Sequence, residues 1–455
     1  MRKGTWRDLR PEIALVWRLS LPAILTQITT IVMQYIDSAM VGARGANASA
    51  AIGLVASSTW LFGGLTSAVA AGFYVQVAHQ IGAENDAEAR NVVRHGLLTA
   101  LVLSGLLALG GALLSKPLPG LLGGGAELNR DAAAYFLVFA LALPFQQLNA
   151  LCSGFLQCSG DMVTPSILNA VMCVLDVAFN TLFIPRYGVL GAGLGTGLAC
   201  AVISLVMAWR CCFCNAALRL RRKETGRFES EILRKALKIG LPVAVQEAAM
   251  CGAQVAATTI IAPLGAVAIA AHSFAVTAES LCYMPGYGIG AAATTLVGRN
   301  IGAGKHAEAK RCGNICTAMG GVFMGVTGAV MMLICPLVFR MLTPDAEVRT
   351  LAAQVLRIGL LAEPLYGVSI VAAGALRGAG DTLVPSLMNL VSIWGVRLGL
   401  ALVLTPRFGL RGMWTAMAVE LCVRGLLMLL RQRTTKYYEH SVVQTGEAAP
   451  MCEEA

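Results

Sequence analysis

One carboxylate interrupts an otherwise uncharged apolar run near the start of the chain. The run extends from Leu21 to Val41 and holds Asp37 close to its end. About 20 apolar residues cross a bilayer as a helix, so this stretch is long enough to span one. A carboxylate inside such a helix costs on the order of 2.5–3.5 kcal/mol and needs a partner, a cavity or a proton. We interpret Asp37 as the coupling site of a transporter.

A second acid, Asp176, lies in a later apolar run, and Asn180 follows it by one helical turn on the same face. Their oxygens suit either H⁺ or Na⁺, so we predict a cation-coupling set of Asp37, Asp176 and Asn180. Asp37 and Asp176 would be metal ligands only if Na⁺ is the coupling ion. The alternatives are a carboxylate satisfied by neighbouring amides and hydroxyls, a structural hydrogen-bond network between helices, or an ion pair to an arginine.

Other side chains within the apolar runs are candidates for substrate binding: Gln34, Tyr35, Glu247, Gln254, Met250 and Tyr283. Aromatic and methionine side chains suit flat cationic compounds, although packing or lipid contact is their commoner role. Pro22 lacks a backbone donor and is expected to bend its helix. Arg397 is expected to pair with an acid or to extend toward an interface. Asp381 follows a glycine at a turn, where we expect a helix N-cap.

The composition is that of a polytopic membrane protein. The chain has 455 residues, of which 56% are hydrophobic and 13% charged. Soluble domains average about 25% charged residues. The net charge of +10 comes from basic residues at the ends of apolar runs, which favours topology-setting charge over nucleic-acid binding. The 14 cysteines show no paired spacing of a zinc site. No cofactor is expected, only H⁺ or Na⁺ as the coupling ion.

Apolar runs and breakers predict an all-α protein with twelve transmembrane helices in two pseudo-symmetric six-helix bundles. The expected spans are 14–41, 49–79, 92–115, 132–156, 163–185, 190–213, 236–261, 269–299, 312–336, 350–375, 383–405 and 410–430. We divide the chain into an N-terminal six-helix lobe (1–218), a basic cytoplasmic linker (219–238), a C-terminal six-helix lobe (239–435) and a disordered tail (436–455).

The two halves repeat at a constant offset of 220 positions. Ile81-Gly82-Ala83 recurs as Ile301-Gly302-Ala303, and Asn169 recurs as Asn389. After one inserted residue, the motif that begins at Pro185 recurs from Pro406. Six helices per repeat return the chain to the same side, so the repeats are parallel and related by an axis along the membrane normal.

The repeat breaks at the candidate coupling residues. Asp37 corresponds to Ala257, so that acid is unique to the first half. Asp176 corresponds to Val396 or Arg397, depending on where the insertion falls. We therefore favour coupling in the first lobe.

Basic residues near the termini and in the central loop outnumber those at the opposite ends of the spans about threefold. This asymmetry predicts a multi-pass protein of the cell membrane with both termini in the cytoplasm.

Five motifs together resemble the multidrug and toxic compound extrusion (MATE) family. They are YIDSAMVG from position 35, QIGAENDAEAR from 80, LPVAVQE from 241, MPGYGIGAAATTLVGRNIGAGKHAEAKR from 284 and LRGAGDTLVP from 376. The resemblance runs from about Leu19 to Arg431. It implies twelve helices in two lobes that form a V, and export of organic cations against inflow of H⁺ or Na⁺.

The resemblance also assigns roles to single residues. Asp37 matches the acid of the family's first helix, and Pro22 matches the proline that bends it. In the DinF-like branch a second acid follows an asparagine by one turn on the fifth helix. Here Asp176 stands at the place of the asparagine and Asn180 at the place of the acid.

The NorM-like branch is matched less well. Its glutamate on the seventh helix falls at Met250, with Glu247 one turn earlier, and Asp381 matches its acid after the tenth helix. The chain is therefore interpreted as nearer the bacterial DinF-like branch.

We conclude from the sequence that the chain is an antiporter that exports amphipathic, mostly cationic compounds, acting in the lipid bilayer as a monomer. A rival function within the same superfamily is a lipid-linked oligosaccharide flippase, which should have more charge in its central cavity. Phosphate-loop, HExxH and GxSxG signatures are absent, so an enzyme is not expected. His272 and Ser280 are too isolated to form a catalytic pair.

Overall fold

The structure is a computed structural model that describes residues 6–220, 229–343 and 345–435. The N-terminal half contains α1 (Trp6–Gly42), α2 (Ala46–Gly82), α3 (Asp86–Leu114), the short α4 (Leu118–Leu121), α5 (Ala126–Cys158), α6 (Val163–Tyr187), α7 (Val189–Trp209) and the π-helical turn η1 (Arg210–Cys214). The C-terminal half contains α8 (Ser230–Ile261), the 3₁₀ turn η2 (Ala262–Leu264), α9 (Ala266–Gly302), α10 (His306–Leu342), α11 (Ala346–Leu360), α12 (Glu363–Gly378), α13 (Leu383–Val391), the π-helical η3 (Ser392–Leu398), α14 (Gly399–Phe408) and α15 (Leu410–Thr434).

The predicted set of twelve spans is confirmed. Eleven helical segments of the described residues are long and apolar enough to cross a membrane, and the pair α11–α12 makes a twelfth. This pair is bent by 55° at its break. Pro364 lies in the first turn of α12, where a proline has no amide hydrogen to continue the preceding helix. The chain is therefore a membrane-embedded, all-α protein.

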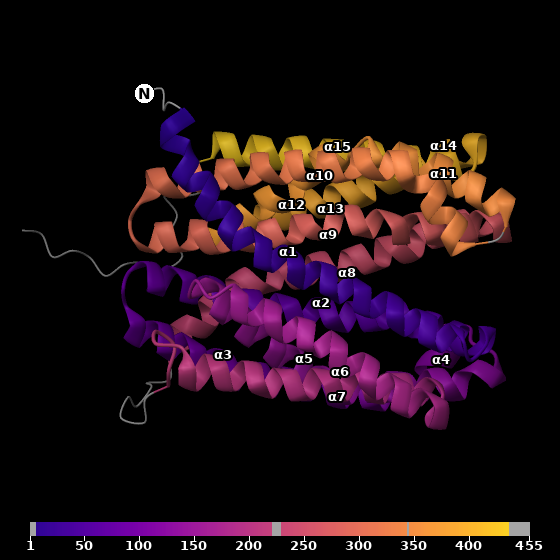
Figure 1. The fold of residues 1–455 in the computed structure, drawn as a ribbon, viewed down its shortest axis with the longest axis horizontal. Helices are drawn as coiled ribbons and strands as arrows, with labels where there is room; N and C mark the ends of the chain where they lie inside the picture. Colours follow the sequence, from indigo (N-terminus) through magenta and orange to yellow (C-terminus); the bar gives the residue numbers. More distant parts are fainter. Residues whose placement is uncertain (1–5, 221–228, 344, 436–455) are drawn as a thin grey trace, which may run out of the picture.

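The helices form two bundles that lie side by side (Figure 1). We call α2, α3, α5, α6 and α7 the N-lobe, and α9 to α15 the C-lobe. Separate hydrophobic clusters fill the two bundles, one around Phe73 and Phe155 and another around Leu356 and Trp414. Figure 1 shows α1 and α8 running between the bundles.

Helix α1 contacts both lobes in turn. In its first half, Trp17 packs against Phe323 of α10, and Glu12 forms an ion pair with Arg311 of the same helix. In its second half, Met33 joins a cluster with Met172 of α6. A change at the α6 end of α1 can therefore reach the C-lobe through one rigid element.

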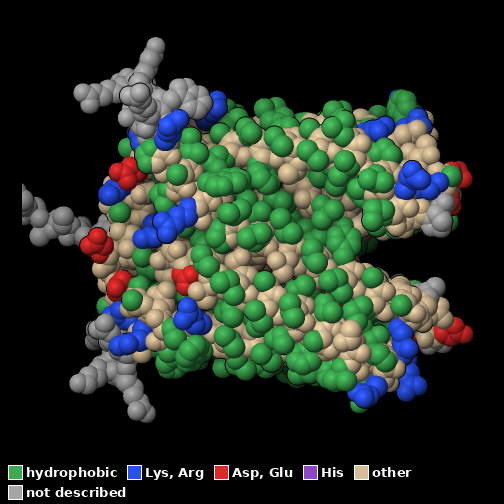
Figure 2. All heavy atoms as spheres, in the orientation of Figure 1, with side chains coloured by type: hydrophobic (Ala, Val, Ile, Leu, Met, Phe, Trp, Pro, Cys, Tyr) green, Lys and Arg blue, Asp and Glu red, His purple; other side chains and the backbone are tan. Residues whose placement is uncertain are grey.

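Helix α8 makes the complementary crossing. Its first half contributes Ile232 and Ala236 to the N-lobe core, and its second half contributes Ala257 and Ile261 to the C-lobe core. The space-filling view shows the lobes in contact at the end that holds the described chain ends, and a cleft between them at the other end (Figure 2). We call these the closed end and the open end.

The inserted residue of the second repeat coincides with η3. The offset is 220 up to Asn389 and 221 from Pro406, and η3 is the π-helical segment between them. A π-turn holds one residue more than an α-turn, so it absorbs the insertion without displacing α14. Gly412 packs against the Leu404 carbonyl as Gly191 packs against that of Phe183, so the register is restored beyond η3.

The predicted domain boundaries differ from the helices at one place. Helix α8 begins at Ser230, so the last part of the linker expected at 219–238 is helical. Residues 221–228 of that linker and the tail expected at 436–455 lie outside the described residues.

Candidate ion-coupling site

The three residues predicted to couple a cation meet between α1 and α6. Buried residues on α6 recur every three or four positions and include Asn169, Asp176 and Asn180, so one face of the helix points inward. Asp176 and Asn180 are both 0% exposed. Asn180 donates a hydrogen bond from Nδ2 to Oδ1 of Asp37 over 2.8 Å. The amide therefore joins the two helices at the half-buried Asp37.

Asp37 has a second acid as its neighbour. The Asp176 carboxyl group and the hydroxyl of Thr196 on α7 both lie close to the Asp37 carboxyl group. Two carboxylates repel each other when both are ionised, and they can bond directly only when one carries a proton. No basic side chain is among the contacts of Asp37 in the described part of the chain. A proton or a cation taken up from solution would therefore relieve the repulsion between the two carboxylates.

Three oxygens at this site have no hydrogen-bond donor among the described residues. Both carboxylate oxygens of Asp176 and Oδ1 of Asn180 are buried without a hydrogen-bond partner among the described residues. A buried acceptor left unsatisfied costs about 1–3 kcal/mol. Gly195 of α7 lies so close to Asn180 Oδ1 that a Cβ there would collide with it. Tyr135 of α5 is also near both carboxyl groups.

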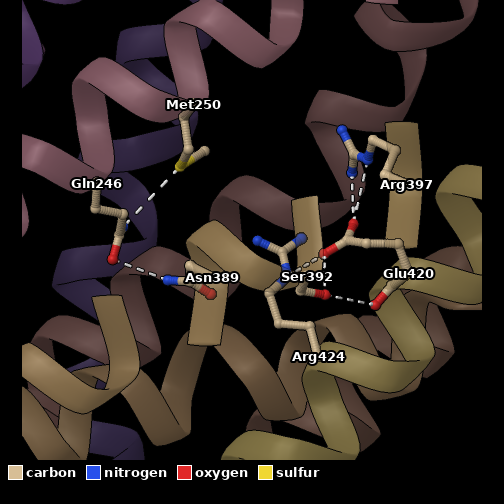
Figure 3. A network of polar contacts seen from close by, with 7 residues as sticks. All are labelled: Gln246, Met250, Asn389, Ser392, Arg397, Glu420 and Arg424. Carbon is tan, nitrogen blue, oxygen red and sulfur yellow. Dashed lines mark hydrogen bonds and ion pairs between the residues drawn. The ribbon is translucent and has the colours of Figure 1, made fainter. Parts of the chain in front are cut away.

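In the C-lobe, the buried carboxylate of Glu420 has basic partners within the protein (Figure 3). Glu420 of α15 is 0% exposed and accepts hydrogen bonds from Arg397 at 2.9 and 3.2 Å. It also pairs with Arg424 at 3.1 Å and accepts a 2.8 Å hydrogen bond from Ser392. The prediction that Arg397 pairs with an acid is confirmed. Because η3 carries both Ser392 and Arg397, the π-helical segment is fixed to α15.

The residues proposed for substrate contact are spread over three helices. Tyr35 donates a hydrogen bond to the Thr277 carbonyl of α9 over 2.5 Å, and Tyr283 packs against Tyr366 with ring centroids 5.5 Å apart. Gln34 and Gln254 are exposed. Tyr35 thus joins α1 to the C-lobe, and these four do not form one cluster with the acids.

Helix α8 carries the remaining two candidates. Met250 is half-buried, and its Sδ lies 4.0 Å from Nε2 of Gln246 (Figure 3). Oε1 of Gln246 accepts a 2.9 Å hydrogen bond from Nδ2 of Asn389. Glu247 lies directly on Gly64 of α2 and close to Arg377 of α12. Glu247 therefore lies where the two lobes meet.

Pro22 and Asp381 are separate from the acid pair. Helix α1 continues through Pro22 without interruption, and the predicted bend there stays a prediction. Asp381 pairs with Arg431 at 2.9 Å, and Thr382, the residue at the start of α13, has no side-chain cap. The N-cap prediction is wrong for Asp381, because Arg431 offers its carboxylate a stronger, charge-assisted partner.

Sequence reasoning missed two groups of residues. Glu279 of α9 was overlooked, although a carboxylate within an apolar span is the signal that identified Asp37. It is 5% exposed, and its Oε1 has no hydrogen-bond partner in the described chain. Glu363 of α12, which the sequence alone suggests as a structural acid, is 1% exposed, and neither of its oxygens has a partner there. Thr196 and Tyr135 were missed because nothing in their spacing shows that α5 and α7 face Asp37.

A metal ion would depend on neutral as well as charged oxygens. Among the described residues, no group of three or more His, Cys, Asp or Glu side chains is placed to hold one. At the α1–α6 site, Na⁺ would need Asn180 and Thr196 beside the two carboxylates. Trp414 donates to His272, and Ser280 donates to the Thr277 carbonyl, so each of the two residues considered for catalysis has a structural contact.

Curated proteins resemble the chain over nearly its full length. It is 28% identical to the probable multidrug resistance protein NorM of Thermotoga maritima, covering 96% of this chain and 95% of that protein. It is 30% identical to a probable NorM of Pseudomonas aeruginosa (96% and 93%) and 27% identical to the multidrug resistance protein PmpM of the same species (97% and 96%). The predicted affinity to the DinF-like branch stays a prediction.

Solved structures share the fold. A MOP superfamily transporter from Pyrococcus furiosus superposes with a TM-score of 0.88 at 20% identity, covering 93% of this chain and 95% of that one. A multidrug resistance MATE transporter described as outward-facing gives 0.87 at 21% identity (93% and 95%). A variant of the Vibrio cholerae MATE transporter VcmN gives 0.88 at 18% identity (95% and 99%).

The family comparison finds the same duplication as the sequence. The family model described as MatE matches residues 22–182 and again residues 242–403, once in each half and at the offsets of the repeat. The chain therefore belongs to the MatE family, the multidrug and toxic compound extrusion family that its motifs resemble.

Proposed function

We propose that the chain is a secondary active antiporter that exports amphipathic, mostly cationic organic compounds in exchange for H⁺ or Na⁺. Membership of the family and relatives named as multidrug resistance proteins support this function. One chain holds both lobes, so the transporter is proposed to act as a monomer.

A single observation carries the coupling role. Three buried oxygens, two on Asp176 and one on Asn180, have no donor in the described chain and lie beside the Asp37 carboxyl group. When no ion is bound and both carboxyl groups are ionised, their repulsion and the unsatisfied oxygens raise the free energy of the protein. A bound proton or Na⁺ would reduce the repulsion and give these oxygens a partner. The N-lobe is therefore proposed to hold the coupling ion.

Helix α1 links ion binding to the lobes. Asp37 lies in its second half against α6, whereas its first half packs on α10 through Trp17 and Glu12. Tyr35, two residues from Asp37, reaches the Thr277 carbonyl of α9. Loading the site changes the charge of α1, so we propose that α1 repacks and shifts the balance between the two openings of the cleft.

We place the closed end in the cytoplasm. The end that holds the described chain ends also holds the start of α8 with its basic residues Arg234 and Lys235, and the positive-inside rule assigns such an end to the cytoplasmic side of the cell membrane. The cleft of Figure 2 then opens outward, the state in which an exporter releases its substrate and takes up its driving ion.

The test is transport in proteoliposomes with a fluorescent organic cation. A pH gradient and a sodium gradient are imposed separately on the wild-type protein and on Asp37→Asn. We expect one gradient to drive uphill export by the wild type and neither to drive it in the variant. Unchanged uphill export by Asp37→Asn would remove the residue from the mechanism.

Asp131→Asn is the matched control. Asp131 is an exposed carboxylate on α5 of the same lobe. Its neutralisation removes the same charge from the N-lobe without touching the α1–α6 site, so this variant should export at the rate of the wild type.

A further inference from the structure

The lobes approach each other closely where α2 and α9 cross at the closed end. Gly82 faces the carbonyl of Arg299, and Gly302 faces the carbonyl of His79. A Cβ added at either glycine would lie far inside the contact distance of that oxygen. Gly82 and Gly302 are related by the repeat offset of 220, and so are His79 and Arg299. The crossing is thus a two-fold contact made of the same positions from each half.

Polar contacts reach across the same crossing in both directions. Nε2 of His79 on α2 donates to the Gly378 carbonyl of α12 over 2.7 Å. In the opposite direction, Arg299 of α9 extends to Gly160, in the turn after α5, where Nη1 lies 2.9 Å from the place of a Cβ. Beside them, Sγ of Cys158 on α5 lies 3.9 Å from the Thr295 hydroxyl of α9.

Across this contact the methyl group of Ala78 on α2 lies against Gly298 of α9, but no large apolar cluster in the described chain joins the two helices. Each hydrophobic cluster of the described residues stays on its own side, and none includes residues of both α2 and α9. Glycine surfaces are flat, so two helices that touch through them can part without changing any rotamer. The crossing is therefore held by close backbone packing and a few hydrogen bonds, which suits a contact that must open and close.

We propose that Gly82, Gly302, His79 and Arg299 form the inner gate of the transport cycle. The two glycines set how closely α2 and α9 can meet, and His79 and Arg299 hold the closed position by reaching the opposite lobe. The proposal rests on the alternating access of the proposed function, because an exporter must open this end to load its substrate.

Cys158 provides a reporter that needs neither gradient nor substrate. It is 2% exposed and is covered from the other lobe by Thr295, so it becomes accessible when the gate opens. Cys212 and Cys312 are 5% and 6% exposed and are buried within the N-lobe and the C-lobe respectively. They should become accessible only if a lobe itself loosens.

The experiment measures the rate at which N-ethylmaleimide alkylates each cysteine of the purified full chain, read by peptide mass spectrometry. In Gly82→Ala and Gly302→Ala we expect the rate at Cys158 to rise about tenfold, which corresponds to about 1.4 kcal/mol in the gate equilibrium. The rates at Cys212 and Cys312 should not change. An unchanged rate at Cys158, or an equal rise at all three cysteines, would overturn the proposal.

Control variants separate the gate from the packing of glycines in general. Gly53 lies on α2 with open space around it, so Gly53→Ala should label like the wild type. Gly374 packs against the Gly290 carbonyl inside the C-lobe. Gly374→Ala should therefore disturb that lobe without raising the alkylation rate of Cys158 above that of the other cysteines. A selective rise at Cys158 in either control would contradict the assignment.

The hydrogen bond is tested by a graded pair at His79. Leucine removes the donor, so His79→Leu should raise the labelling of Cys158 by a smaller factor than Gly82→Ala. Glutamine retains a donor, so His79→Gln should restore part of the protection. Equal labelling of the two variants would exclude a latch at this residue. These results do not depend on Asp37, so the gate can stand or fall separately from the coupling site.

Discussion

In the N-lobe, Asp176 has both oxygens buried without a donor among the described residues, whereas in the C-lobe Glu420 is neutralised by Arg397 and Arg424. The first arrangement has a free energy that depends on what it binds. The second supplies its own counter-charges. Since a common scaffold carries both, the comparison separates a site that awaits a cation from an ion-pair network that braces helices.

The contrast is not absolute, because the C-lobe also holds Glu279 and Glu363 with unpartnered oxygens in the described chain. Arg397 and Arg424 are near enough to attract Glu279, and Glu363 is near Glu279. Glu363 is therefore the C-lobe residue most like Asp176.

Glu420→Ala should have the largest effect on stability. It would leave the buried Arg424 and the half-buried Arg397 without their shared acid, and losing one partner of a buried ion pair costs about 3–5 kcal/mol. Thermal unfolding in detergent would measure the loss. Glu308→Ala is the control, because its 3.9 Å pair with Lys305 is exposed and should contribute less than about 1 kcal/mol. Equal melting temperatures of the two variants would refute a stabilising role for the Glu420 ion pairs.

Gly195→Ala should have an intermediate effect that is local to the N-lobe. The new methyl group would displace the Asn180 amide from Asp37, at a cost of about 1–3 kcal/mol. The C-lobe already has Ala416 at the matching position, where Ala401 replaces the asparagine. Gradient-driven export should fall together with stability. Export at the wild-type rate would show that the Asn180 contact is dispensable.

Asp176→Asn should have the smallest effect on stability, a change within about 1 kcal/mol of the wild type. The substitution removes a negative charge that has no basic partner in the described chain, so no opposite charge is left unpaired. Uphill export should nevertheless be lost. A melting temperature as low as that of Glu420→Ala would mean that the Asp176 carboxylate is paired with a basic group of the protein.

The sequence supports the overall plan because its signals are local or repeated. Apolar runs mark the spans, and the constant offset shows the duplication and its one inserted residue. The position of η3 could not be predicted, because any turn between Asn389 and Pro406 could absorb that residue. Asp37 and Asp176 stand out as charges in apolar runs, but the position of Thr196 and Tyr135 near them depends on how α5 and α7 pack. The pairing of Arg397 with Glu420 likewise depends on tertiary structure.

The most direct test of the central claim is a count of the ions bound by the purified protein. Radioactive sodium binding and proton uptake would be measured on the wild type, Asp37→Asn, Asp176→Asn and Glu363→Gln. The account predicts that the wild type binds one of these ions, that Asp37→Asn and Asp176→Asn lose it, and that Glu363→Gln retains it. Ion binding that survives in Asp37→Asn and Asp176→Asn and disappears in Glu363→Gln would contradict the account and move the coupling site to the C-lobe.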